Sequence, residues 1–182
     1  LELDDSGRIT PLAAGAPRGP LAFGIGKRVL WLVLLGMFLS AFPLITFAED
    51  KELFAPLLRT RIPGVLQRIG VCYGIAALLF LFTKTAVQRT VLCGVLLGYW
   101  AIVTWVPVPG VAAPDLGDPM TTLQGYLDRL VFGNHIYVKG KYDPEGLLST
   151  MPAIGTCLLG VEAGRVLVSA REPLAKVRAL LL

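Results

Sequence analysis

Charged residues are scarce in this sequence of 182 residues: Asp, Glu, Lys and Arg make up 16% of it, whereas hydrophobic residues make up 54%. A soluble domain of this size needs more charge to cover its surface. The charges that are present gather between long apolar runs, as they do when such runs lie in lipid. The sequence therefore predicts an integral membrane protein that contacts the lipid bilayer.

Several functional classes lack their signatures as well. Lys and Arg form no dense patch with interleaved aromatic residues, so the net charge of +4 does not indicate nucleic-acid binding. The three cysteines, Cys72, Cys93 and Cys157, do not have the spacing of metal ligands, and no metal is expected. No GxSxG, HExxH or P-loop motif occurs. The residues alone therefore predict no specific catalytic class.

Four apolar runs are long enough to cross a hydrocarbon core, and they predict an all-α, polytopic membrane helix bundle. We expect the spans at about 29–47, 63–82, 87–106 and 144–168. Within the loop 107–143, residues 123–132 predict one interfacial helix, because their leucines share one face and Asp128 and Arg129 point elsewhere. The expected division is a flexible loop at 1–26, a bundle at 27–170, and a basic cytoplasmic segment at 171–182 that leads into a missing part.

The distribution of Lys and Arg predicts how the bundle is oriented. Lys27, Lys84 and Arg89 flank one end of the spans, and the basic segment 171–182 follows at the same end. The opposite segments mix basic with acidic residues, including a charged loop at 49–52. By the positive-inside rule, the loop 107–143 faces outward, into the periplasm if the protein lies in a bacterial inner membrane.

Small residues spaced four apart recur in all four spans, and such pairs let helices approach closely in lipid. We expect them to pack the bundle internally; the alternative is a dimerisation face and hence a homo-oligomer. The pairs are Gly36 and Ser40, Gly70 and Gly74, Gly94 and Gly98, and Gly160 and Gly164.

Polar residues at the start of the second span are the first candidates for a site. Gln67 and Arg68 lie about one turn into an apolar helix, where ionisable groups are costly and usually face a cavity or a partner. Alternatively, Arg68 extends to the lipid headgroups. Pro63 suits the first turn of the helix.

The start of the fourth span carries a second group. Asp143 before Pro144 is typical of a helix N-cap, and Glu145 faces the same membrane boundary as Arg68, so these two are expected to pair. Pro152 is expected to kink the span.

Further polar residues outside these two groups also need an interpretation. His135, the only histidine, is either solvated or a base that binds a sugar hydroxyl. Glu162 and Arg165 fit an ion pair along one helix.

Four strings of the sequence resemble one known family. They are 61–68 (RIPGVLQR), 125–137 (GYLDRLVFGNHIY), 142–150 (YDPEGLLST) and 159–164 (LGVEAG). They look like the transmembrane acetyltransferases related to heparan-alpha-glucosaminide N-acetyltransferase, whose bacterial branch is called NagX-like. The resemblance covers about residues 27–170. It implies part of a larger helical bundle that moves an acetyl group from cytoplasmic acetyl-CoA to the amine of a glucosamine-type sugar outside.

The resemblance also suggests roles for residues. The family's catalytic histidine is expected upstream of this chain, which alone is expected to be inactive; His135 matches a later loop histidine. His135 and Glu145 are the catalytic candidates within the chain. The substrate-binding candidates are Arg61, Gln67, Arg68, His135, Asp143 and Glu145, and weaker candidates for the phosphates of acetyl-CoA are Lys84, Arg89 and Arg165.

Two other functions fit the same residues. An amino-sugar transporter or permease component also carries polar residues in its spans and has broken helices. A non-catalytic membrane packing module would explain the small-residue pairs. Under that last hypothesis, substitutions of Arg68 and Glu145 would alter stability alone.

Overall fold

The computed structural model describes residues 17–42, 60–111, 115, 117–138, 141–169 and 171–181. Four of its helices are long and apolar enough to cross a membrane: α2 (Arg18–Ala41), α4 (Val65–Phe82), α5 (Thr85–Trp105) and α7 (Thr150–Val168). Two shorter helices, α6 (Leu123–Phe132) and α8 (Pro173–Leu181), complete the described secondary structure. The predicted all-helical membrane bundle is confirmed.

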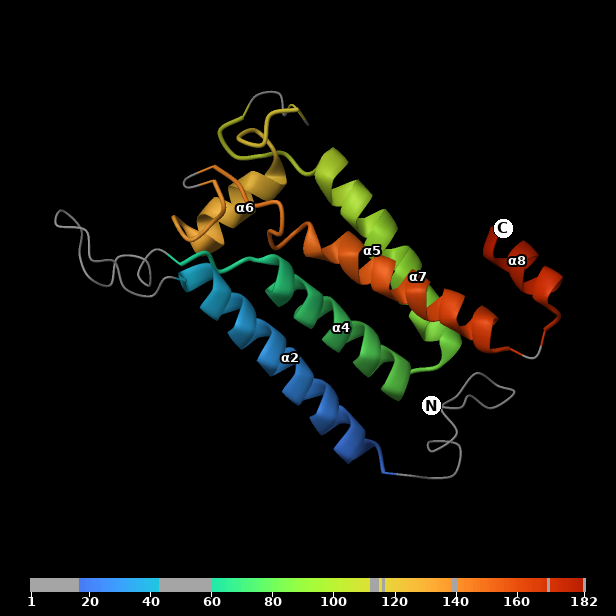
Figure 1. Ribbon diagram of the computed structural model, residues 1–182. Helices are drawn as coiled ribbons and strands as arrows, with labels where there is room; N and C mark the ends of the chain where they lie inside the picture. Colours follow the sequence, from blue (N-terminus) through green and yellow to red (C-terminus); the bar gives the residue numbers. More distant parts are fainter. Residues whose placement is uncertain are drawn as a thin grey trace.

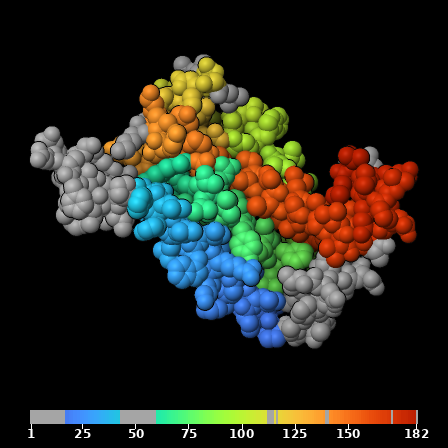
Figure 2. All heavy atoms as spheres, in the orientation of Figure 1, coloured from blue at the N-terminus to red at the C-terminus, as the bar shows by residue number. Residues whose placement is uncertain are grey.

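The four long helices lie side by side in the order α2, α4, α7, α5, because α4 packs against both α2 and α7, and α5 packs against α7 (Figure 1). The same order is visible on the molecular surface, where α4 lies between α2 and α7 (Figure 2). The last residues of α2 and α5 and the first residues of α4 and α7 meet at one end of the bundle. Helix α6 and the loops around it cover that end.

Two small apolar cores hold this arrangement together. Ala76, Leu92 and Leu158 join α4, α5 and α7 within the bundle. Val108, Leu123 and Leu148 form a second core beneath α6, which packs the loop end onto α5 and α7. Few residues of the four spans are fully buried, as expected for helices that face lipid.

The small-residue pairs differ in how closely another helix approaches them. A Cβ on Gly74 would lie 2.8 Å from Cγ2 of Val29, and a Cβ on Gly70 would lie 3.2 Å from Cβ of Leu32, so α2 and α4 need these glycines for close packing. By contrast, no described atom lies within 4 Å of such a Cβ on either pair of α5 and α7. Among the described residues, Gly94, Gly98, Gly160 and Gly164 therefore have no close helix neighbour, and their internal packing stays a prediction.

Two predicted boundaries need correction. Residues 18–26, expected as loop, belong to α2. Arg28 therefore lies within this helix, and its Nη1 donates to the hydroxyl of Tyr73 on α4 at 3.2 Å. Helix α7 begins at Thr150 and not at 144, so Pro152 lies in its first turn, where the missing N–H costs nothing and no kink follows. Most of the segment 171–182 forms α8. The charged loop 49–52 and residues 43–47 of the first predicted span lie outside the described residues.

Candidate functional site

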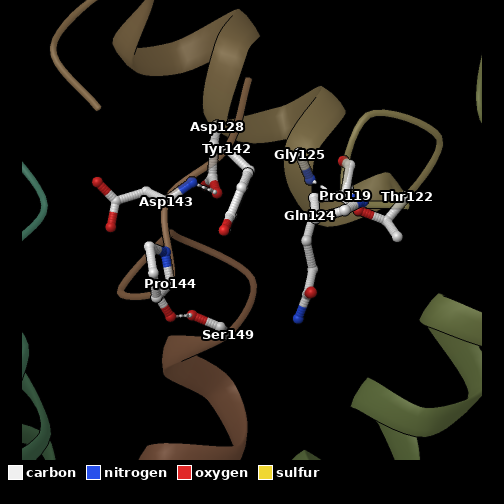
Figure 3. Close-up of a pocket in the computed structure, with 9 residues that line it drawn as sticks. All are labelled: Pro119, Thr122, Gln124, Gly125, Asp128, Tyr142, Asp143, Pro144 and Ser149. Atoms are coloured by element: carbon white, nitrogen blue, oxygen red, sulfur yellow. Dashed lines mark hydrogen bonds between the residues drawn. The ribbon is translucent and has the colours of Figure 1, made fainter. Parts of the chain in front are cut away.

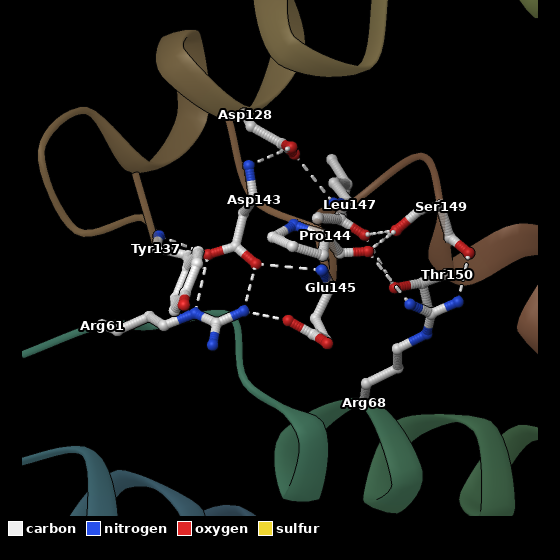
Figure 4. Close-up of polar contacts among 11 residues, drawn as sticks. Arg61, Arg68, Asp128, Tyr137, Asp143, Pro144, Glu145, Leu147, Ser149 and Thr150 are labelled. Carbon is white, nitrogen blue, oxygen red and sulfur yellow. Dashed lines mark hydrogen bonds and ion pairs between the residues drawn. The ribbon is translucent and has the colours of Figure 1, made fainter. Parts of the chain in front are cut away.

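The two strings that open the second and fourth spans meet at the loop end of the bundle (Figure 4). Nε of Arg61 donates to Oδ2 of Asp143 at 2.8 Å, and Nη2 donates to Oδ1 at 2.5 Å. The same Nη2 also donates to Glu145. This two-pronged geometry is the strongest form of ion pair between arginine and a carboxylate. Arg61 thereby joins the segment before α4 to the turn before α7.

The ion pair between Arg61 and Asp143 is largely buried. The side chain of Asp143 is fully buried, and that of Arg61 is about one-fifth exposed. The hydrogen bond to Asp143 raises the pKa of Arg61 further above its ordinary value, although burial opposes the change. The guanidinium also lies over the ring of Tyr137, 4.8 Å from its centre. Arg61 therefore stays charged and pairs with both acids.

Asp143 does not cap α7, in contrast to the prediction. The N-cap of α7 is Ser149, six residues later, with no side-chain hydrogen bond at the cap. The carboxylate of Asp143 instead accepts hydrogen bonds from the backbone N–H groups of Tyr137 (2.7 Å) and Glu145 (2.9 Å). It thus holds together two loops and Arg61, because its four lone-pair sites suit several donors at once.

Arg68, in the first turn of α4, binds the backbone of the turn 144–149. Its guanidinium donates to the backbone carbonyls of Pro144 (3.1 Å) and Ser149 (2.9 Å). The expected pairing of Arg68 with Glu145 is therefore wrong, since Arg61 takes the carboxylate of Glu145. Extension of Arg68 to the headgroups stays a prediction, although two protein carbonyls already bind its guanidinium. Arg68 satisfies the polar backbone of the irregular turn 144–149 at the membrane boundary, where water is scarce.

A carboxylate that sequence reasoning did not select lies behind this turn. Asp128 on α6 is 1% exposed, and its oxygens accept from the backbone N–H groups of Leu147 (3.0 Å) and Asp143 (3.4 Å). Desolvation raises its pKa, and these hydrogen bonds only partly oppose the rise. A Cβ on Gly146 would collide with the carboxylate, so glycine is needed there.

The signal for Asp128 was weak in the sequence. On the predicted surface helix it pointed away from the leucine face, and so it was not selected for a site. In the structure the polar side of α6 faces the loop 141–149, while Leu130 and Val131 are exposed. Tyr137 was missed for a similar reason, because its contact with Arg61 depends on a loop that no local pattern specifies.

His135 links the loop 133–138 to the segment that precedes α4. Its Nδ1 donates to the carbonyl of Thr60 (2.9 Å), and its own carbonyl accepts from the backbone N–H of Ile62 (2.9 Å). Because a carbonyl oxygen only accepts, Nδ1 is the donor of this contact.

A groove of about 530 Å³ runs between α4 and α7. Arg68 and Glu145 line it at the loop end, and Cys72, Tyr73 and Cys157 line it within the spans. It links the polar cluster with the apolar interior of the bundle, so an elongated ligand with a polar end and an apolar body fits it.

Gln67 does not face this groove. It is buried where α4 meets α2, and its amide lies against the positions that a Cβ on Gly36 or Gly64 would occupy. Among the described residues no acceptor lies within hydrogen-bonding distance of its Nε2. The structure therefore separates Gln67 from the other candidates of its string.

The cationic candidates lie at the other end of the bundle. Glu162 receives hydrogen bonds from Arg89 (2.9 Å) and from Arg165, which confirms the expected pair within α7 and adds a link to α5. Arg165 also donates to Gln88. Lys84 occupies the N-cap position of α5. Of these side chains, that of Arg89 is two-thirds exposed.

No family model matches this chain. Human heparan-alpha-glucosaminide N-acetyltransferase is 35% identical over a 153-residue alignment, which covers 60% of this chain and 23% of the human protein. The mouse protein of the same name is 34% identical over the same shares. The chain thus spans about a quarter of the length of these relatives. The resemblance found in the sequence strings is confirmed: this chain is homologous to a part of the heparan-alpha-glucosaminide N-acetyltransferases.

Proposed function

We propose that this chain forms the acceptor side of a transmembrane N-acetyltransferase. The complete protein would transfer an acetyl group from acetyl-CoA to the amine of a glucosamine-type sugar. The observation that carries the proposal is the meeting of the strings 61–68 and 142–150, about 80 residues apart, in one network at one end of the bundle. The homology to named N-acetyltransferases supports the reaction class.

Amine acetylation requires a neutral amine, a base and stabilisation of the developing oxyanion. Within this chain, Nε2 of His135 and the carboxylate of Glu145 are the groups suited to accept a proton. We assign Asp143 and Arg61 to a different task, because they neutralise one another and hold the loops in place. Arg68 is likewise occupied by two carbonyls and so positions the turn that carries Glu145. The catalytic histidine that the resemblance implies is not among these residues.

The donor is proposed to approach from the opposite end. Arg89, Arg165 and Lys84 gather there, and the exposed guanidinium of Arg89 suits a phosphate. The basic residues at this end favour the cytoplasm. We therefore propose that the loop end, with residues 107–143, faces outward, which is the periplasm if the membrane is a bacterial inner membrane. The named relatives are mammalian.

The test is acetyl transfer by the full-length product of the reading frame that contains this chain. Membrane vesicles would receive radiolabelled acetyl-CoA on one side and glucosamine on the other. We expect Glu145→Gln to lower kcat at least tenfold at normal expression, with Glu172→Gln, an exposed acid at the far end, as the matched control. Absence of transfer by the unsubstituted protein would refute the reaction. Unchanged kcat in Glu145→Gln would refute the role of Glu145. Uptake of labelled glucosamine without acetyl-CoA would favour a transporter.

A further inference from the structure

A second cavity, with a volume of about 170 Å³, lies at the same end of the bundle (Figure 3). It lies between α6 and the segment that leads into α7. The side chains of Tyr142 and Gln124 both extend into the space between these two segments. Its lining residues are Pro119, Thr122, Gln124, Gly125, Asp128, Tyr142, Asp143, Pro144 and Ser149.

Asp128, at the back of this cavity, is a buried acid without a cation. Asp143 and Glu145 are paired with Arg61, and Glu162 is paired with two arginines. Among the described residues no Lys or Arg forms an ion pair with Asp128; the adjacent Arg129 donates instead to the carbonyls of Lys141 and Met120. A buried carboxylate without a cation is costly. A ligand that brings a positive charge to the cavity would offset that cost.

The rest of the lining suits a ligand with several hydroxyl groups. Tyr142 and Ser149 present hydroxyls, and Gln124 presents an amide whose Nε2 donates to Tyr99, which leaves its oxygen as an acceptor. Pro119 and Pro144 supply apolar faces against which the C–H face of a sugar ring can pack. The volume lies below the range of drug-sized sites, about 300–1,000 Å³. It therefore suits one monosaccharide unit.

We propose that this cavity binds the amino-sugar acceptor, with the amine toward Asp128 and the ring hydroxyls toward Tyr142 and Gln124. The identity of the sugar rests on the proposed function, whereas the site rests on the cavity and its unpaired acid. The assignment differs from the one made from the sequence, which placed the sugar on Asp143 and Glu145. Asp143 already has its cation in Arg61, whereas Glu145 does not line this cavity and is proposed above as a proton acceptor, not as a binding group.

The test is binding of glucosamine, glucose and N-acetylglucosamine to the detergent-solubilised chain, measured by calorimetry. We expect glucosamine to bind at least tenfold more tightly than glucose, since glucose lacks the amine. N-acetylglucosamine is expected to bind more weakly still, because its amide is neutral and bulky.

Two variants test the residues. Tyr142→Phe removes one hydroxyl and leaves the ring, so it is expected to fold and to weaken glucosamine binding about fivefold to tenfold, the value of one hydrogen bond. Asp128→Asn is expected to remove the preference for glucosamine over glucose. Glu172→Gln is the control that should bind as the unsubstituted chain does.

Outcomes for the cavity and for the enzyme can be told apart. Equal affinity for glucosamine and glucose, no glucosamine binding by the unsubstituted chain, or unchanged affinity in Tyr142→Phe would each overturn the cavity assignment. Acetyl transfer by the full-length protein with an unchanged KM in Tyr142→Phe would overturn it while the enzymatic proposal stands. Glucosamine binding that depends on Asp128 and Tyr142, without acetyl transfer, would uphold the cavity and refute the enzyme.

Discussion

Replacement of Arg61 by alanine should release the loop end of the bundle. Arg61 is the cation that neutralises the fully buried Asp143, and it also holds Glu145. Removal of one partner from a buried ion pair costs about 3–5 kcal/mol, because the remaining charge is left buried and unpaired. Two backbone N–H groups still donate to Asp143, and Arg61 is itself partly exposed. We therefore take the lower end of the range, about 3 kcal/mol.

The effect is best measured where the contact lies. The backbone N–H groups of Tyr137 and Glu145 donate to Asp143, so their hydrogen exchange reports local opening. A loss of about 3 kcal/mol corresponds to exchange faster by about 150-fold, at about 1.4 kcal/mol per factor of ten. Exchange mass spectrometry of peptides covering 133–149, in detergent, measures this directly.

Two matched variants sharpen the test. Arg61→Lys keeps the charge and loses the two-pronged geometry, so we expect an intermediate rate. Arg89→Ala removes an exposed arginine from another ion pair, which is worth about 0–1 kcal/mol, and should leave the loop unchanged. If Arg61→Ala exchanges no faster than Arg89→Ala, Arg61 does not hold the loop and the reasoning fails.

Four other predictions follow, each from a single residue and its contacts. Gly146→Ala should destabilise the fold by about 2 kcal/mol or more, because its Cβ would collide with Asp128; a melting temperature in detergent within 1–2 °C of the unsubstituted chain would contradict this. The pKa of Asp128 is raised above 3.8, so its contribution to stability should be greatest below pH 3.8 and should be lost as the pH rises through the raised value. Asp128→Asn lacks this titration, so the difference in melting temperature between the two proteins should change over that pH range; a constant difference would contradict the prediction. Gly74→Leu should separate α2 from α4 because a Cβ there already lies 2.8 Å from Val29, and a cysteine crosslink between these helices should form more slowly; an unchanged rate would argue against the close packing. Finally, Arg68→Gln should increase protease cleavage of the turn 144–149, because the carbonyls of Pro144 and Ser149 lose the guanidinium as a donor; equal cleavage would show that other groups satisfy them.

The helical spans could be predicted because hydrophobic length is a local property. The second and third predicted spans match α4 and α5 within two residues at each end. The boundaries of α6 were predicted correctly, and the structure supplies the reason. Thr122 caps its first turn through a hydrogen bond from Gly125 N–H, and Gly133 ends it with a φ of +55°.

The start of the fourth span shows where local signals mislead. Asp143 and Pro144 have the pattern of a helix start, yet the helix begins at Thr150. The side chain of Asp143 gains more from a buried pairing with Arg61 and two loop N–H groups than from capping a helix. A residue that can cap a helix can also satisfy distant donors, and the sequence does not say which donors come near.

By itself, the sequence determined that this chain is a helical membrane bundle, and its strings revealed the relationship to N-acetyltransferases. It also selected Arg61, Asp143 and Glu145. Tertiary structure alone decided that Arg61, and not Arg68, binds both acids, that Gln67 faces another helix, and that Asp128 lies buried without a cation beside a polar cavity. The physical reason is that apolar length and helix caps act within a few residues. The partner of a charged side chain, in contrast, depends on which distant segments the bundle brings together.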